Sequence, residues 1–385
     1  MTVTAPKGFL ASGVAAGLKS KGGADLALVQ NLGPHFAAAA VFTSNRAKAN
    51  PIIWSQQAVS DGIVSAIILN SGGANCYTGA YGFQTTHATA EAVADGLGVS
   101  AADVLVCSTG LIGYGGEEFR STLLAAIPAS ISALHDDGGT DAALAIMTTD
   151  SVPKTAVVDR GAWSLGAMAK GAGMLAPGLA TMLVVITTDA LLSSSELDDA
   201  LRAATRVTFD RLDSDGCMST NDQVSLLASG ASEVSPSADE FTAALTEICA
   251  SLARQLQADA EGASHNIAIE TIHAATEDDA VEVGRSVARN NLFKAAVFGN
   301  DPNWGRVLAA VGTTQAEFDP YAIDVTINGV RVCRSGEPDR PATEVDLSPR
   351  EVHVLIDLKV GDATATILTN DLTHDYVHEN SAYSS

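Results

Sequence analysis

Cysteine is scarce in this chain of 385 residues, and no two of its five cysteines form a Cys-x-x-Cys pair. They are spread along the sequence at Cys76, Cys107, Cys217, Cys249 and Cys333. An odd number of widely spaced cysteines does not suit a framework of disulfide bonds. We therefore expect reduced thiols, as in a cytosolic protein.

Long hydrophobic runs and basic residues are also in short supply. No segment approaches the ~20 apolar residues that a membrane helix requires, and the first residues lack the basic start and apolar stretch of a secretion signal. Only 22 Lys and Arg stand against 45 Asp and Glu, so the net charge is −23. Nucleic acid and anionic membranes repel such a polyanion, and its charge serves solubility. These absences predict a soluble cytoplasmic protein that binds neither nucleic acid nor membrane.

Apolar residues, in contrast, are plentiful: 46% of the chain is hydrophobic and only 17% is charged. A chain of this length can form two or three packed units. Apolar segments of strand length alternate with patterns of helical period, which agrees with an α/β fold but does not single one out. Short strands and turns are expected over residues 1–60, and further strands at 63–69, 103–107, 152–168 (a hairpin), 182–188, 294–298, 322–327, 352–358 and 363–368. Helices are expected at 87–97, 117–134, 194–212, from a Ser237 cap to about 256, and at 276–291.

A loop that contains glycine and proline leads into one of these strands, at residues 170–183, Lys-Gly-Ala-Gly-Met-Leu-Ala-Pro-Gly-Leu-Ala-Thr-Met-Leu. Pro177 fixes φ, and the glycine after it permits a sharp turn. Thr181 therefore stands where a tight loop enters the apolar strand 182–188. Such a strand would aim the hydroxyl and the loop would leave room for a substrate, which suits a nucleophile. An ordinary connection has the same pattern, and the glycines do not complete a phosphate-binding motif.

This segment closely resembles the self-cleavage site of the ornithine acetyltransferase family, the glutamate N-acetyltransferases of arginine biosynthesis. The family pattern is Lys-Gly-small-Gly-Met-hydrophobic-x-Pro-x-x-Ala-Thr-Met-Leu. Seven other blocks match the family in order, at 70–75, 108–113, 146–150, 215–222, 259–263, 301–306 and 380–385. The resemblance therefore spans essentially the whole chain.

The resemblance implies a layered α/β sandwich of the self-processing type, with its nucleophile at the start of a core strand. Thr181 would attack the carbonyl of Ala180, so that the chain cuts itself into an α chain, 1–180, and a β chain, 181–385. The β chain would comprise a core over 181–275 and a C-terminal α/β unit over 276–385. Cleavage would free an α-amine with a reference pKa of about 7.7–8.0, which can act as the base beside the threonine hydroxyl.

The implied activity is a ping-pong transfer of the acetyl group from N2-acetylornithine to glutamate, which yields ornithine and N-acetylglutamate. The resemblance assigns the oxyanion hole to Thr109 and Gly110, and the substrate contacts to Thr148, Lys170, Thr181, Glu261, Asn380 and Ser385. It implies no cofactor, no metal and an α₂β₂ heterotetramer. Gly73 and Ser264-His265-Asn266 depart from the family pattern, and use of acetyl-CoA as a second acetyl donor stays open.

From the residues alone, other interpretations stay open beside these assignments. Ser108-Thr109-Gly110 suits an oxyanion hole but is also common in turns. Glu261 has the features of an ordinary solvated glutamate. His374 and His378 could share a helix face, but no third zinc ligand stands nearby. Three acids could suggest a calcium site, namely Asp213, Asp215 and Asp222. Their spacing lacks the loop glycine and the closing glutamate of an EF-hand, so a turn is favoured.

Two other functions also stay open. A self-cleaving aminopeptidase or amidohydrolase would release an amino acid or free acetate instead of passing an acetyl group to glutamate. A non-catalytic small-molecule binding protein would stay uncut and would exchange no acetyl group.

Overall fold

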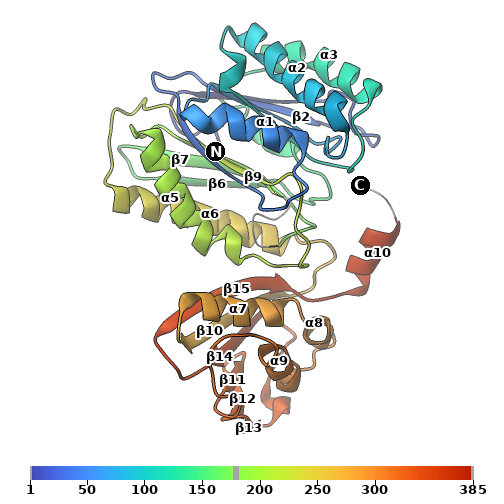
Figure 1. Ribbon diagram of the computed structural model, residues 1–385, viewed down its shortest axis with the longest axis vertical. Helices are drawn as coiled ribbons and strands as arrows, with labels where there is room; N and C mark the ends of the chain where they lie inside the picture. Colours follow the sequence, from blue (N-terminus) through green and yellow to red (C-terminus); the bar gives the residue numbers. More distant parts are fainter. Residues whose placement is uncertain (1, 177–181, 383–385) are drawn as a thin grey trace.

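The computed structural model describes residues 2–176 and 182–382, which form a larger upper body and a smaller lower body (Figure 1). In the upper body two sheets lie face to face between outer layers of helices. The lower body is built on a third sheet with its own helices. The predicted layered α/β fold is therefore confirmed.

The first sheet of the upper body has the strand order β1-β2-β4-β5, and only its β4–β5 pair is parallel. Its strands are β1 (Phe9–Val14), β2 (Leu26–Asn31), β4 (Ala66–Asn70) and β5 (Val104–Ser108). Apolar side chains of two long helices, α2 (Gly79–Leu97) and α3 (Glu117–Ser132), pack on its outer face. Gly98 ends α2 with a left-handed φ of 71°, as expected for a glycine after a helix. Two further helices border this sheet, α1 (Asn50–Ala58) and α4 (Gly139–Ala145).

The second sheet has the order β3-β9-β8-β7-β6. Its strands are β3 (Ala37–Phe42), β6 (Lys154–Asp159), β7 (Ser164–Lys170), β8 (Leu183–Thr188) and β9 (Gln223–Ala228). Two helices cover its outer face, α5 (Ser194–Val207) and α6 (Ala238–Ala258). Ser193 and Glu196 form a capping box at the start of α5, and the Ser237 hydroxyl accepts a hydrogen bond from Glu240 N–H at the start of α6.

Strand β8 lies in the middle of this sheet, and all six of its residues are buried. Leu183 and Val185 point into the core between the two sheets, whereas Val184 and Ile186 pack against α5 and α6. Burial on both faces explains why this strand has a continuous apolar sequence instead of an alternating one. The strand expected at 182–188 is therefore confirmed.

The sheet of the lower body has the order β13-β12-β11-β14-β10-β15. Its strands are β10 (Asn266–Ala274), β11 (Asp324–Ile327), β12 (Val330–Arg334), β13 (Glu337–Pro338), β14 (Glu351–Asp357) and β15 (Ala363–Asn370). Helices α7 (Glu277–Ala288), α8 (Asn291–Phe298) and α9 (Trp304–Val311) complete this body, and α10 (His374–Ala382) returns toward the upper body (Figure 1). Short 3₁₀ turns lie at Val59–Asp61, Ala101–Asp103, Phe209–Arg211 and Ala342–Glu344.

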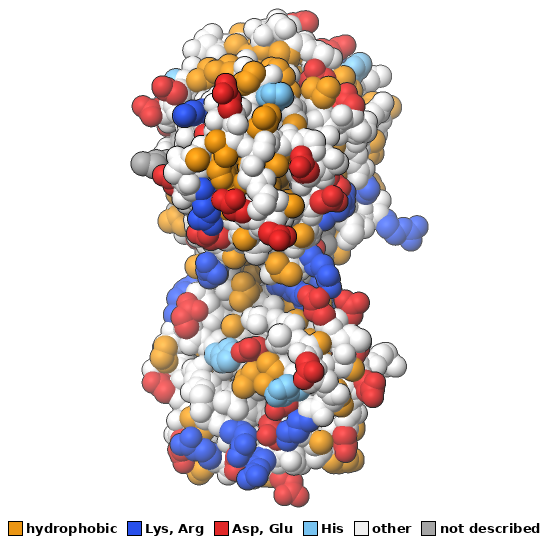
Figure 2. All heavy atoms as spheres, turned by 90° about the vertical axis from the view of Figure 1, so that its left-hand side faces the viewer, with side chains coloured by type: hydrophobic (Ala, Val, Ile, Leu, Met, Phe, Trp, Pro, Cys, Tyr) orange, Lys and Arg blue, Asp and Glu red, His pale blue; other side chains and the backbone are white. Residues whose placement is uncertain are grey.

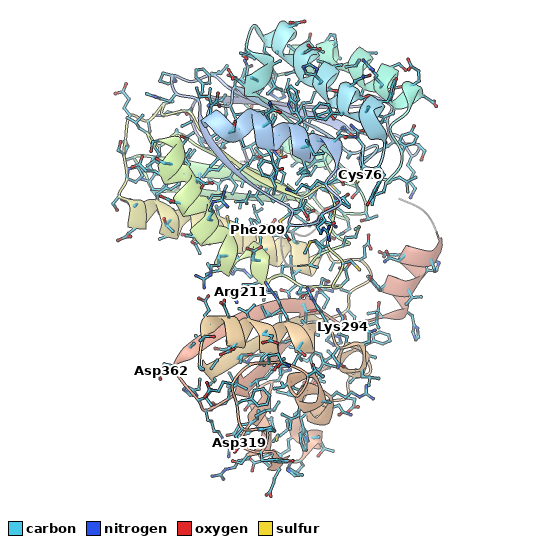
Figure 3. The ribbon with its side chains drawn as sticks, in the orientation of Figure 1. Cys76, Phe209, Arg211, Lys294, Asp319 and Asp362 are labelled. Carbon is cyan, nitrogen blue, oxygen red and sulfur yellow. The ribbon has the colours of Figure 1, made fainter. Side chains whose placement is uncertain are left out.

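The two bodies meet at a narrower waist, which Figure 2 shows in side view. Arg211 lies at this joint (Figure 3) and pairs with Glu277 of α7, with 2.5 Å between Nη2 and Oε1. Leu212 of the upper body also forms a parallel bridge with Leu368 of β15. Within 2–176 and 182–382, no helix has both the length and the hydrophobicity needed to cross a membrane.

Two secondary-structure predictions were wrong. Residues 50–58, expected to lie among short strands and turns, form helix α1. Residues 294–298 were expected to form a strand, but they are the second half of helix α8. The Asn290 side chain caps this helix by accepting a hydrogen bond from Phe293 N–H, and the buried positions follow a helical spacing. A run of only four apolar residues after Lys294 cannot distinguish a strand from a buried helix.

Candidate active site

The predicted oxyanion residues and the predicted lysine lie side by side. Lys170, at the end of β7, is almost completely buried, and its Nζ donates a hydrogen bond to Thr109 Oγ1 at 3.3 Å. Because the lysine is the donor, the hydroxyl hydrogen of Thr109 remains available to an oxyanion. Gly110 follows with a φ of 125°, which favours glycine. The structure therefore brings Lys170 to the Thr109-Gly110 turn, although Lys170 and Thr109 lie 61 positions apart in the sequence.

Gly73, one of the departures from the family pattern, lies against this turn. A Cβ built on Gly110 would come within 2.8 Å of Gly73 N, so the two backbones approach closely. A Cβ on Gly73 itself would come within 2.8 Å of the Tyr114 ring and 3.1 Å of the Phe119 ring. The local packing of two aromatic rings thus accounts for the glycine.

Beside Lys170 lies a buried set of charges that sequence reasoning did not find. Lys154 Nζ contacts Asp150 Oδ1 and Asp259 Oδ2, each at 2.6 Å. Burial alone would raise the pKa of Asp150, but the ammonium groups of Lys170 and Lys154 hold it at about 2. Burial lowers the pKa of Lys170, and the Asp150 carboxylate opposes that effect. Both aspartates stand inside sequence blocks that match the family, but the pairing of Lys154 with Asp259, 105 residues away, had no signal in the sequence.

Asp150 also fixes the backbone around the site. Its carboxylate accepts hydrogen bonds from Gly171 N–H at 2.6 Å and from Thr148 N–H at 2.9 Å. It therefore connects the predicted substrate residue Thr148 to the segment that follows Lys170.

Glu261 and Asn380, two further predicted substrate residues, are in direct contact. Asn380 Nδ2 donates to Glu261 Oε2 at 3.0 Å, and Glu261 N–H donates to the carbonyl of Ala172 at 3.0 Å. The carboxylate lies so close to Gly173 that a Cβ there would be 2.5 Å from Oε2. A cavity of about 580 Å³ opens beside Glu261, between residues 258–264 and helix α10.

The second departure from the family pattern holds the loop that follows Glu261. The backbone N–H groups of Ser264 and His265 donate to Asp371 Oδ1 at 3.0 and 2.9 Å, and His265 Nδ1 lies 2.8 Å from Asp371 Oδ2. These side chains therefore contact Asp371, at the end of β15, and stabilise the loop.

Ala180, Thr181 and Ser385 lie outside the described residues. The residue after Thr181 is described: Met182 N–H donates to Asp222 Oδ1 at 3.2 Å. His374 and His378 do lie on one helix, α10. Within the described part of the chain, no group of three or more His, Cys, Asp or Glu side chains could hold a metal ion.

Comparisons with known proteins agree with the motifs. The model of the ArgJ family matches residues 10–385. The arginine biosynthesis bifunctional protein ArgJ of Streptomyces avermitilis is 61% identical over 385 residues, which cover 100% of both chains. ArgJ of Mycobacterium tuberculosis is 53% identical over 391 aligned residues, which cover 100% of this chain and 96% of the relative. A crystal structure of ornithine acetyltransferase complexed with ornithine, from Mycobacterium tuberculosis, shares 51% identity over 47% of this chain and 96% of its own, with a TM-score of 0.45.

A match of this level over the whole chain defines an acyltransferase of arginine biosynthesis. The chain belongs to the ArgJ family, which confirms the resemblance found in its sequence.

Proposed function

We propose that this enzyme cleaves itself between Ala180 and Thr181 and then carries the acetyl group of N2-acetylornithine to glutamate on the Thr181 hydroxyl. The observation that supports this most directly is the contact of Lys170 with Thr109. It brings the lysine of the cleavage motif to the oxyanion motif, at the end of the sheet where β8 begins.

Self-cleavage would start with attack of Thr181 Oγ on the carbonyl carbon of Ala180. The peptide C–N bond breaks, an ester forms, and the hydroxyl proton passes to the new α-amine. Water then hydrolyses the ester, which leaves a carboxylate on Ala180 and a free amine on Thr181.

In acetyl transfer the free α-amine accepts the Thr181 hydroxyl proton as Oγ attacks the acetyl carbon. The C–N bond of acetylornithine breaks, and the proton leaves with ornithine. The amine of glutamate then attacks the acetyl-threonine ester, and Thr181 Oγ recovers a proton. Thr109 and the N–H of Gly110 stabilise both tetrahedral oxyanions, each such donor being worth about 3 kcal/mol of the barrier.

The remaining predicted residues would hold the amino acid. Glu261, oriented by Asn380, offers a carboxylate to a cationic amino group, and Thr148 is held near Lys170 by Asp150. Ser385 would complete this set. The same proposal includes α and β chains in an α₂β₂ heterotetramer, cytoplasmic localisation, and acetyl-CoA as a second acetyl donor, since the relatives are named bifunctional.

The first test is the intact mass of the purified protein beside a Thr181→Ala variant, with Thr314→Ala as a threonine control in the lower body. We expect two fragments that separate between Ala180 and Thr181 in the wild type and in Thr314→Ala. Thr181→Ala should give one chain of 39.4 kDa. A single uncut chain that still transfers acetyl would contradict the free-amine mechanism.

The second test separates the acetyl donors and the competing function. Glutamate is supplied with either N2-acetylornithine or acetyl-CoA, and N-acetylglutamate and free acetate are both measured. Stoichiometric N-acetylglutamate from acetylornithine supports transfer. Free acetate as the main product would instead indicate an amidohydrolase.

A further inference from the structure

The acidic loop 213–222 contacts the chain on both sides of residues 177–181. Upstream, Met174 N–H donates to Asp215 Oδ2 at 2.7 Å, and Ser214 N–H donates to the carbonyl of Leu175 at 2.6 Å. Met174 has a φ of +54°, a left-handed conformation that residues with a side chain rarely adopt. Such a conformation persists only where its surroundings hold it. The loop supplies two of the hydrogen bonds that do so.

On the downstream side the same loop holds Met182. Met182 N–H donates to Asp222 Oδ1 at 3.2 Å, and Gln223 N–H donates to the carbonyl of Met182 at 3.2 Å. The Asp222 carboxyl is completely buried, and its Oδ2 has no hydrogen-bond partner among the described residues. Burial raises the pKa of Asp222 well above its usual value, which favours an uncharged acid beside Met182.

A third contact connects the loop to the oxyanion turn. Asn221 Nδ2 donates to the carbonyl of Ser108 at 2.8 Å and to that of Ala74 at 2.7 Å. The loop is in turn anchored to the lower body, where Lys294 of α8 (labelled in Figure 3) donates to the carbonyl of Ser214. One loop therefore joins the segment before the predicted cleavage site, the strand after it and the turn that carries Thr109.

We propose that loop 213–222 is a positioning frame for self-cleavage, in which Asp215 and Asp222 fix the backbone before and after the bond between Ala180 and Thr181. The proposal rests on the self-cleavage described above. The attack brings a hydroxyl to within about 3–3.5 Å of a carbonyl carbon, and a displacement of about 1 Å can slow such a step on the order of 100-fold. The hydrogen bonds of Met174 and Leu175 on one side, and of Met182 on the other, hold in place the described residues that flank the predicted cleavage site.

The test follows cleavage of the full chain after a pulse of cell-free synthesis, with the uncut fraction measured by intact mass. Asp215→Ala and Asp222→Ala should slow cleavage on the order of 100-fold. Asp222→Asn keeps an uncharged oxygen acceptor for Met182 and should cleave at close to the wild-type rate. Asp213→Asn is the matched control, since Asp213 is a buried acid of the same loop that pairs with Arg289 instead of the cleavage segment.

A second pair of variants acts on the backbone without disturbing the core. Met174 is 36% exposed, so its replacement disturbs less packing than that of a core residue and also changes the conformational preference of the chain. Met174→Gly adopts a positive φ readily and should retain cleavage, whereas the β-branched Met174→Val disfavours it and should slow cleavage. Melting temperatures of the variants identify any that fail to fold. If an aspartate variant does not fold, the cleavage rates of the two Met174 variants test the positioning frame in its place.

The outcomes separate the two proposals. A wild-type chain that never cuts would overturn self-cleavage itself. A wild type that cuts, with Asp215→Ala, Asp222→Ala and Met174→Val cutting at the same rate, would overturn only the positioning frame. Equal slowing in Asp213→Asn would also overturn it, because general loosening of the loop would then explain the effect.

Discussion

Replacing Lys154 should destabilise the upper body strongly, because this lysine neutralises two buried carboxylates. Its side chain has no exposed surface, the Asp150 side chain has none, and that of Asp259 is 10% exposed. Lys154→Met keeps most of the apolar stem but leaves both acids without their ammonium partner. Removal of one partner from a buried ion pair typically costs about 3–5 kcal/mol.

The structure favours the lower end of that range, about 3 kcal/mol, because each acid retains other contacts. Asp150 still faces Lys170 and accepts hydrogen bonds from Gly171 and Thr148. Asp259 still accepts a hydrogen bond from Ser151 N–H at 3.0 Å.

The measurement is the free energy of unfolding in urea at pH 7, in a Thr181→Ala background that keeps the chain in one piece. Lys359→Met is the matched control: Lys359 also lies 2.6 Å from an aspartate, Asp324, but its side chain is 35% exposed. An ion pair so accessible to water contributes about 0–1 kcal/mol. If Lys154→Met cost no more than Lys359→Met, the reasoning from burial would be wrong.

Three further predictions follow from the same site. The pKa of Asp150 is about 2 against an ordinary 3.8, so its ionised carboxylate contributes about 2.5 kcal/mol to the free energy of unfolding above pH 4. This contribution is lost as the pH falls toward 2. The free energies of unfolding of the wild type and of Asp150→Asn, measured along an acid titration, should therefore converge at low pH. Gly173→Ala should lower activity with little loss of stability, because the added Cβ displaces the flexible Glu261 carboxylate. In the control Gly116→Ala the added Cβ meets no atom within 4 Å, so neither activity nor stability should change. Thr109→Ala should lower kcat by about 10²–10³ if its hydroxyl stabilises the oxyanion, and an unchanged kcat would exclude that role.

Local signals in the sequence were sufficient to place many elements. Ser193 and Ser237 mark the starts of α5 and α6, and the continuous apolar run of β8 was correctly taken as a buried strand. Helix α1 was missed although Pro51 at its start is a known helix signal. Strand β10 was missed because its pairing with β14 and β15 is a long-range contact that no local pattern announces.

The site shows the same division between local motifs and long-range contacts. Sequence motifs identified the candidate site residues. Only the fold shows that Lys170 contacts Thr109 and that the Glu261 carboxylate lies against Gly173. Of the acids with the largest structural role in the site, Asp150 stood within a motif and was given no function, and Asp222 was assigned only to a turn. Their partners are backbone N–H groups, which have no signature in a sequence.

The position of Asp259 at the end of a helix explains why Lys154 is buried beside the site. Helix α6 ends at Ala258, so Asp259 is its C-terminal cap, where the partial negative charge of the helix end disfavours a carboxylate. Lys154 offsets that charge and pairs with Asp150 at the same time. Glu261 stands two residues farther along, bonded through its N–H to Ala172, and its own contact is the neutral Asn380. Because Lys154 balances the charge at the helix end, Glu261 keeps a neutral hydrogen-bond partner, which suits its proposed role in binding a cationic substrate group.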